Sequence, residues 1–297
     1  MKRRVIIVLF DGCELLDFGG PGQALHEASL HGGEFETIYA APQPSVLIEQ
    51  GLRISDLPPL PEPRDSDWII VPGYTPDGKH DHGKIVEWLR RAATTEALIA
   101  SVCTGTFLLG QAGLIDGKQV TTHWKRVTEL QARFPRAKVI GDRLFVRDGR
   151  IVSSAGIAAG IDMMLALIEE ENGPAVASDV AREMVVYLRR DASHRQESVY
   201  LDYQTHLSPS LHRLQQWLIA NPGSTESVAE LAEMANMSTR HLSRLFRKAT
   251  GIGIHDFRTR LRVERARVLV NDPSLTLEAI ATACGFAGAR QLRRQYR

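Results

Sequence analysis

The sequence predicts two folded parts, an α/β domain built on a doubly wound parallel sheet and an all-α domain that follows it. Between residues 5 and 171, short apolar runs alternate with helical patterns, which is typical of a parallel sheet covered by helices on both faces. From Pro209 onward the pattern is helical throughout, and one motif occurs in it twice. With 297 residues, of which 43% are hydrophobic, the chain is long enough for two packed cores.

The elements of the first domain follow from its apolar runs and the turn residues between them. Residues 5–10 (Val-Ile-Ile-Val-Leu-Phe) are typical of a strand that is buried on both faces. We expect further strands at 35–40, 68–71 and 98–103, and helices that end near Leu30 or span 84–93, 105–113, 160–171 and 174–188. Segments 144–146 and 151–153 flank Asp148-Gly149, a dipeptide that favours a hairpin turn.

Composition divides the chain into residues 1–188, a polar linker at 189–207 and a helical domain at 208–297. The net charge of +1 conceals an asymmetry: residues 208–297 carry 14 Lys and Arg against 7 Asp and Glu, whereas residues 1–190 carry 21 against 25. A basic module favours nucleic-acid contact at the C-terminal end, although an ordinary solvated surface explains such a split equally well.

The cysteines and the chain start indicate the compartment. Cys13, Cys103 and Cys284 lie far apart and no Cys-x-x-Cys occurs, so neither a disulfide framework nor a zinc module is expected. These features fit a reducing cytoplasm. The apolar run at 5–10 is too short for a signal-peptide core, and no run approaches the length of a membrane span.

The repeated motif is an apolar helix, a tight turn and a second helix with arginines on one face, the pattern of a helix-turn-helix DNA reader. The first copy starts at Leu231 and reaches Phe246; the second starts at Ile280 and includes Arg290, Leu292 and Arg294. A soluble amphipathic helix is the alternative for either copy alone, and the repetition argues against it.

The first recognition helix is predicted over residues 239–249, with Ser238 as its N-cap. Helical spacing puts Leu242, Leu245 and Phe246 on the inward stripe. The opposite face carries Arg240, Ser243, Arg244 and Arg247. Arginine forms two hydrogen bonds to guanine in the major groove, so this face can read sequence.

Cys103 is the sharpest chemical feature of the first domain. It ends a predicted strand and precedes the small residues Thr104-Gly105-Thr106 at a helix start, which puts its sulfur at the carboxyl edge of the sheet. The helix N-terminus favours the thiolate, whereas a buried, inert cysteine is the alternative. Asp17 and His123 are able to tune a thiolate; taken alone, the first is a loop residue or cap and the second a structural histidine.

Two weaker patterns occur in one loop. Gly73-Tyr74-Thr75-Pro76-Asp77-Gly78-Lys79-His80 nearly spells a phosphate-binding loop, but His80 replaces the Ser or Thr that holds magnesium, and Pro76 with Asp77 opposes an anion cradle. Asp77, His80, Asp81 and His82 are better explained as solvated loop residues than as a metal site. We therefore expect neither a metal nor a cofactor.

Residues 4–172 resemble the DJ-1/PfpI superfamily, also called class I glutamine-amidotransferase-like, through Phe10-Asp11-Gly12, Leu16-Asp17, Val71-Pro72-Gly73, Val102-Cys103-Thr104-Gly105 and Val120-Thr121-Thr122-His123. The resemblance implies a flavodoxin-like sheet with Cys103 on an elbow and Asp17 hydrogen-bonded to it. It also implies a nest of backbone N–H groups near Gly73 and Thr104, with His123 nearby. The family's usual Pro-Gly-Gly is replaced here by Pro72-Gly73-Tyr74, which puts a ring at the pocket mouth and weighs against enzyme activity.

Residues 210–297 resemble the AraC/XylS family of transcription regulators, through Ser227–Met237, Thr250-Gly251, Arg262, Ala266, Leu269 and Ile280-Ala281. The resemblance implies that a long helix at 256–270 joins two helix-turn-helix units. It also implies that Arg240, Ser243 and Arg244 read bases in the first unit, and that Arg290, Gln291 and Arg294 do so in the second. Because the family continues beyond the position of Arg297, we expect a shortened C-terminus and a frayed second unit.

Together the two resemblances predict a cytoplasmic, homodimeric transcription regulator that binds double-stranded DNA. Its first domain would sense a small amine, amino acid or related metabolite through Asp17, Gly73, Tyr74, Cys103, Thr104 and His123. One alternative is a Cys103-dependent enzyme of the hydrolase or hydratase type. The other is a redox sensor that works by oxidation of Cys103.

Overall fold

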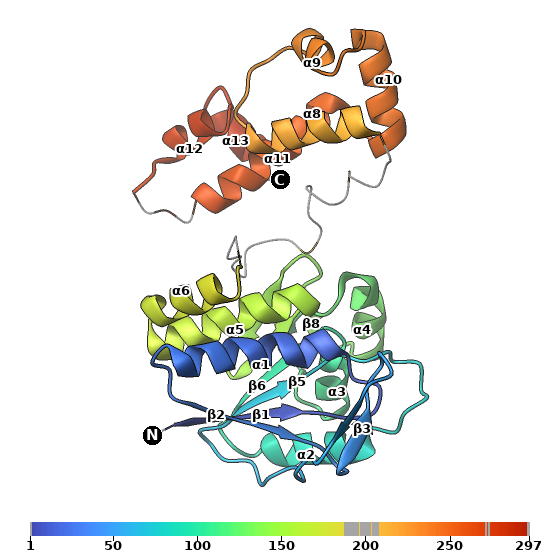
Figure 1. The fold of residues 1–297 in the computed structure, drawn as a ribbon, viewed down its shortest axis with the longest axis vertical. Coiled ribbons are helices and arrows are strands. Elements are labelled where there is room, and N and C mark those ends of the chain that lie inside the picture. The colour runs from blue at the N-terminus through green and yellow to red at the C-terminus, as the bar shows by residue number, and fades with distance from the viewer. Residues whose placement is uncertain are drawn as a thin grey trace. The chain divides into compact units, whose positions relative to one another are not determined.

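The computed structural model describes residues 2–186, 196, 203, 208–270, 272 and 274–295. The chain divides into two compact units, residues 1–196 and 197–297, which are described separately (Figure 1). This division falls inside the linker predicted at 189–207. Apart from Gln196 and Tyr203, that linker lies outside the described residues.

The first unit is built on a six-stranded sheet, and its α/β fold is confirmed. The strand order is β2-β1-β5-β6-β10-β9, and every neighbouring pair is parallel except β10–β9. The strands span Arg3–Val8 (β1), Phe35–Ala40 (β2), Trp68–Val71 (β5), Leu98–Val102 (β6), Phe145–Asp148 (β9) and Ile151–Ser154 (β10). The order reverses between β1 and β5, which is where doubly wound sheets open a crevice for ligands.

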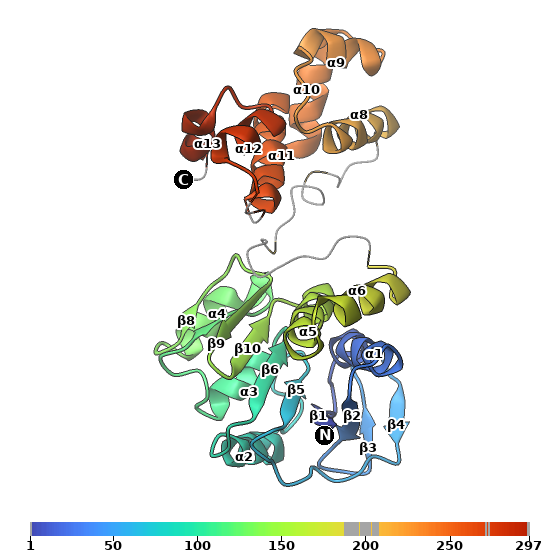
Figure 2. The same cartoon turned by 90° about the vertical axis from the view of Figure 1, so that its left-hand side faces the viewer.

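Helices cover both faces of this sheet (Figure 2). Helices α1 (Leu15–Leu30), α5 (Ile157–Asn172) and α6 (Pro174–Glu183) pack together on one face. The other face carries α2 (Gly83–Ala92), α3 (Gly105–Gln111) and α4 (Val127–Arg133). The central strands have no exposed face because both sides are covered, and this explains their continuous apolar runs.

Sequence patterns missed the shortest elements of the first unit. These are a hairpin of β3 (Ser45–Leu47) and β4 (Arg53–Ser55), a parallel pair of β7 (Gln119–Val120) and β8 (Lys138–Val139), the 3-10 turn η1 (Trp124–Arg126), and α4. Strands of two or three residues are too short to establish a period. The predicted hairpin at Asp148-Gly149 is confirmed, with Gly149 in the left-handed region. Helix α6 ends at Glu183, before the predicted residue 188, which lies outside the described residues.

The second unit is entirely helical in the part that the structure describes. Its helices are α8 (Pro209–Ala220), α9 (Val228–Met234), α10 (Thr239–Thr250), α11 (Ile254–Leu269), α12 (Leu277–Ala283) and α13 (Ala289–Gln295). Ser227, Ser238 and Thr276 each accept a hydrogen bond from a backbone N–H three residues on, and so begin α9, α10 and α12. One core lies among α8 to α11 and a second among α11 to α13.

Two arginines of α11 bind the loop between α8 and α9. Arg258 donates to the backbone oxygens of Glu226 and Ser224, and Arg262 donates to those of Pro222 (3.1 Å) and Ser224 (2.6 Å). Burial, together with the charge of Arg258, lowers the pKa of Arg262. These bonds attach the loop between α8 and α9 to the helix that links both motifs.

No helix in the described part of the chain combines the length and the apolar character needed to cross a membrane.

We expect Arg262→Met to loosen the second unit, because it leaves the carbonyl oxygen of Pro222 without its donor and that of Ser224 with Arg258 alone. The expected cost is about 1–3 kcal/mol in the opening free energy of α9 and α10. Hydrogen–deuterium exchange of peptides from 208–270 measures it. Arg265→Met, on an exposed position of the same helix, is the matched control and should leave the exchange unchanged. Equal exchange in both variants would contradict the structural role of Arg262.

Candidate functional site

Cys103 forms a strained elbow between β6 and α3. Its backbone lies in the left-handed region, with φ 57°, which a side chain other than that of glycine rarely adopts. Its N–H donates to the carbonyl oxygen of Ser154 (3.0 Å), and its carbonyl oxygen accepts from the Thr122 hydroxyl (2.9 Å). The elbow is therefore held by β10 on one side and by the segment before His123 on the other.

Asp17 contacts the elbow from the first turn of α1, where it is completely buried. Its Oδ2 accepts a hydrogen bond from the Gly73 N–H (3.0 Å), while Oδ1 has no partner among the described residues. A Cβ atom on Gly73 would lie 2.3 Å from Asp17 Oδ2 and 2.8 Å from the Cβ of Cys103. Only glycine fits at position 73, so the structure brings these three predicted residues together.

Burial determines the protonation of both groups. It raises the pKa of Asp17 to about 7, against the hydrogen bond from Gly73, which lowers it. It also raises the pKa of the Cys103 thiol to about 12, and the Asp17 charge acts in the same direction. The prediction that the helix N-terminus favours a thiolate is therefore wrong, because desolvation and a neighbouring carboxyl outweigh the contacts from Thr104.

His123 lies near Cys103, on the far side of Gly156. A Cβ built on Gly156 would lie 3.2 Å from Cδ2 of His123 and 3.8 Å from Sγ of Cys103. The His123 side chain accepts a hydrogen bond from the Lys125 N–H (3.4 Å). Burial, followed by the charges of Lys125 and Arg126, lowers the pKa of His123, so both the imidazole and the thiol are uncharged near neutral pH.

Two backbone amides at the expected oxyanion nest, those of Gly73 and Tyr74, donate to side chains of the protein. The Gly73 N–H donates to Asp17, and the Tyr74 N–H donates to the Thr104 hydroxyl (2.7 Å), which in turn donates to the carbonyl oxygen of Tyr74. Side-chain oxygens of the protein therefore occupy the donors at 73 and 74, and the expected nest at Gly73 and Thr104 stays a prediction. A substrate oxygen would have to displace them.

A layer of hydroxyl groups supports the elbow, and sequence analysis missed it. Ser101 and Thr106 share a hydrogen bond of 2.9 Å, and Thr106 also donates to the carbonyl oxygen of Thr121. The side chain of Gln196, the last residue of the first unit, donates to Thr121 Oγ1 (3.0 Å) and to the Thr122 carbonyl oxygen (2.9 Å). The end of this unit is thus attached next to His123, a contact for which the sequence gives no signal.

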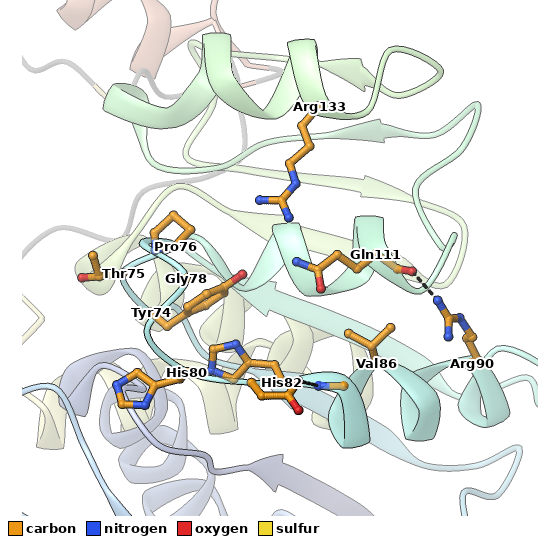
Figure 3. Close-up of a pocket in the computed structure, with 12 residues that line it drawn as sticks. Tyr74, Thr75, Pro76, Gly78, His80, His82, Val86, Arg90, Gln111 and Arg133 are labelled. Atoms are coloured by element: carbon orange, nitrogen blue, oxygen red, sulfur yellow. Dashed lines mark hydrogen bonds between the residues drawn. The ribbon is translucent and has the colours of Figure 1, made fainter.

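A cavity of about 570 Å³ lies beside Tyr74 (Figure 3). The Tyr74 ring is only 6% exposed and contacts the rings of Phe10 and His82 edge-on. The cavity is lined by the loop that contains Tyr74, by the start of α2, and by Arg90, Gln111 and Arg133, but not by Cys103 or Asp17. A smaller cavity of about 300 Å³, lined among others by Phe10, Asp11 and Lys84, shares His80, Asp81 and His82 with it.

Polar side chains of the loop at 77–82 bond to groups close to them in sequence. Lys79 pairs with Asp77 (2.6 Å), and Asp81 accepts from the Gly83 N–H (2.8 Å). Within the part of the chain that the structure covers, no three His, Cys, Asp or Glu residues are arranged to hold a metal ion.

The recognition helices have the faces that the sequence predicted. On α10, Leu242 and Phe246 are buried and Leu245 is partly buried, while Arg240, Ser243, Arg244 and Arg247 are exposed. On α13, Leu292 is buried and the exposed residues include Arg290 and Arg294. Neither helix contains an acidic residue.

Some residues of these helices differ from expectation. The side-chain oxygen of Gln291 accepts from the Ala287 N–H (2.7 Å), so it stabilises the turn before α13, while its amide NH2 group is exposed and its contact with a base stays a prediction. His241, Lys248 and Arg293 are also exposed on these helices, at positions for which the sequence predicted no role. The positive charges of Lys248 and Arg293 are the feature of the sequence that points to a DNA-facing position.

Comparison with known proteins agrees with this architecture. A model of the DJ-1/PfpI family matches residues 3–170, and a model described as a helix-turn-helix domain matches residues 231–297. The chain is similar to the HTH-type transcriptional regulator CdhR of Pseudomonas aeruginosa, with 31% identity over 256 residues, 85% of this chain and 75% of that protein. It is 32% identical to the HTH-type transcriptional regulator GlxA of Rhizobium meliloti over 204 residues, 67% of this chain and 61% of GlxA.

One relative is an enzyme. Isonitrile hydratase of Pseudomonas putida is 33% identical over 171 residues, 57% of this chain and 72% of the enzyme. Among solved structures, an AraC family transcriptional regulator from Pseudomonas putida covers 61% of this chain and 98% of its own, with a TM-score of 0.56 and 20% identity. A ThiJ/PfpI family protein from Pseudomonas syringae covers 80% of this chain and 90% of its own, with a TM-score of 0.54 and 22% identity. These structures support the fold.

We expect Asp17→Asn to change how stability depends on pH. The pKa of Asp17 is higher in the folded chain, about 7, than its ordinary value of 3.8, so the folded state binds an extra proton between these values. The wild type therefore loses stability as pH rises through that window, by roughly 2 kcal/mol between pH 5 and 7. Asparagine keeps an oxygen for the Gly73 N–H but cannot ionise.

Calorimetric unfolding of wild type and Asp17→Asn across pH 5 to 8 measures this difference. The gap between the two proteins should change steadily up to about pH 7 and then level off. Two parallel curves would show that Asp17 does not titrate in this range.

Proposed function

The chain belongs to the DJ-1/PfpI family and carries an AraC-type helix-turn-helix domain, and we propose that it works as a DNA-binding transcriptional regulator whose first domain senses a small metabolite. The observation that carries this proposal is the pair of recognition helices α10 and α13. Both expose arginines and contain no acidic residue. Such helices suit the negatively charged major groove.

The division of roles on the first recognition helix follows from its geometry. Arg240, Ser243 and Arg244 lie in the N-terminal half of α10, where helices of this type contact base edges. Arg247 lies one turn further on and suits a phosphate contact, which fixes position without reading sequence. In the second motif, Arg290 and Arg294 would contact base edges.

A metabolite regulates such a protein only when it binds one of two conformations more tightly. The Cys103 region is suited to this because Asp17, Gly73, Tyr74, Thr104 and His123 surround a strained elbow. Gln196 supports a route to the second domain, since it attaches the end of the first unit beside His123. We further propose that the protein works as a homodimer in the cytoplasm.

An enzyme that uses Cys103 is the second candidate, favoured by the similarity to isonitrile hydratase. Three observations weigh against it: the raised pKa of the thiol, the uncharged imidazole of His123, and the engaged amides of Gly73 and Tyr74. The raised thiol pKa also weighs against a redox sensor, because oxidation begins from the thiolate. We therefore infer a binding domain without enzymatic turnover.

We expect Arg240→Ala combined with Arg244→Ala to weaken DNA binding by about 100-fold or more, because each arginine–base contact contributes roughly 1–3 kcal/mol. Mobility-shift titrations with fragments from upstream of the protein's own coding sequence measure this. The control is Arg91→Ala with Arg136→Ala, which removes the same charge from two exposed ion pairs of the first domain. No shift for the wild type at low salt would exclude the proposed function.

We expect Cys103 to be alkylated by iodoacetamide more slowly than free cysteine at pH 7, with a rate that still rises above pH 9. The reason is its raised pKa of about 12, which leaves little thiolate. Mass spectrometry of the peptide that contains Cys103 gives its rate separately from those of Cys13 and Cys284. A rate that reaches a plateau near neutral pH would favour the enzyme or the redox sensor.

A further inference from the structure

We propose that the cavity of about 570 Å³ beside Tyr74 is a binding site for the anionic head group, carboxylate or phosphate, of a small molecule, held chiefly by Arg133 and Arg90. This site is separate from the Cys103 elbow, because neither Cys103 nor Asp17 lines it. It does not depend on the proposed function, since it concerns binding to the first unit alone.

Arg133 is a positioned charge that pairs with no carboxylate in the part of the chain that the structure describes. Among the described residues it forms no ion pair or hydrogen bond, yet its guanidinium lies 6.0 Å from the ring centroid of Phe107 and 5.9 Å from that of Phe134. The acidic residue on the same helix, Glu129, is paired with Arg126 (2.9 Å). Two aromatic rings therefore hold a guanidinium at the cavity, and its hydrogen-bond donors remain available.

Arg90 supplies a second guanidinium from α2. It donates one hydrogen bond to the backbone oxygen of Gln111 (3.0 Å), which fixes its direction without neutralising its charge. In Figure 3, Arg133 extends down from α4 and the side-chain amide of Gln111 extends from α3, and both point toward the hydroxyl of Tyr74. Burial raises the pKa of Tyr74, and the neighbouring Arg133 and Gln111 act against that rise.

The remaining lining leaves the positive charge in excess. Asp81 is the one carboxylate among the lining residues, and it accepts a hydrogen bond from the Gly83 N–H. His82 stays uncharged near neutral pH because burial lowers its pKa, and its ring packs against Tyr74 and Phe10. Val86 and Pro76 add apolar surface. The volume suits a metabolite-sized molecule.

The chemistry of the lining selects the head group. A planar guanidinium binds the two oxygens of a carboxylate or phosphate with two parallel hydrogen bonds. The Gln111 amide and the Tyr74 hydroxyl are neutral groups that add hydrogen-bond donors. An anion accepts hydrogen bonds from such donors, whereas a cation does not. A ligand here would touch Tyr74, whose backbone N–H is bonded to Thr104 next to Cys103.

Isothermal titration calorimetry of the full chain with sodium phosphate and with sodium acetate, at ionic strength held constant with sodium chloride, tests the site. We expect the wild type to bind at least one of the two anions, and Arg133→Gln to weaken that binding by about tenfold or more. Arg136→Gln is the matched control, because Arg136 lies three residues away, is exposed and pairs with Asp116. It should bind as the wild type does.

The pattern of binding identifies the head group. Binding of phosphate alone indicates a phosphorylated ligand, and binding of acetate alone indicates a carboxylate. The proposal is overturned when neither anion binds to the wild type, or when Arg133→Gln binds as tightly as the wild type does. Because Arg133 is exposed, its replacement should leave the fold intact, and circular dichroism checks this. Mobility-shift titrations of DNA without added anion test the proposed function separately. The anion site and the DNA-binding function can therefore be rejected independently of each other.

Discussion

The first domain depends on one buried contact, the hydrogen bond from the Gly73 amide to the carboxylate of Asp17. A carboxyl group in an apolar interior is costly unless it is protonated or hydrogen-bonded, and here a single N–H meets one of its oxygens. This contact ties α1 to the loop after β5 and excludes any side chain at position 73. The next residue, Tyr74, lines the neighbouring cavity while its backbone N–H is bonded to Thr104 beside the elbow, so the two candidate binding regions adjoin at this loop.

In the second unit, position on the helices divides the basic residues into two kinds. Arg258 and Arg262 are partly buried and bind carbonyl oxygens, so their charge serves to attach the α8–α9 loop to α11. Arginines on α10 and α13 are exposed and therefore accessible to phosphates or bases. The net charge of the second unit therefore overstates the positive charge that is exposed for contact with DNA. The two motifs share a rigid linking helix, which suits a reader that must enter successive grooves.

Sequence patterns predicted most of the fold because long buried runs and helical stripes leave clear periods. β2 and β5 have the predicted bounds, and α10 differs by one residue at its end. The elbow at Cys103 followed from a strand that ends at a helix start. What the sequence could not predict depends on segments that meet only in three dimensions: Arg133 reaches the cavity from the short helix α4, and Gln196 returns to Thr121. The thiolate prediction was wrong for the same reason, because a local helix N-terminus says nothing of the burial around it.

The turn of the second motif and the loop before the first meet at two glycines. A Cβ on Gly285, which has a φ of 75°, would lie 2.7 Å from the carbonyl oxygen of Gly223, and a Cβ on Gly223 would lie 2.9 Å from that of Ala283. Neither position accepts a larger residue while the other backbone stays in place. Mutational tolerance at one motif is therefore limited by the other, and the pair is expected to evolve as one unit although each motif has its own core.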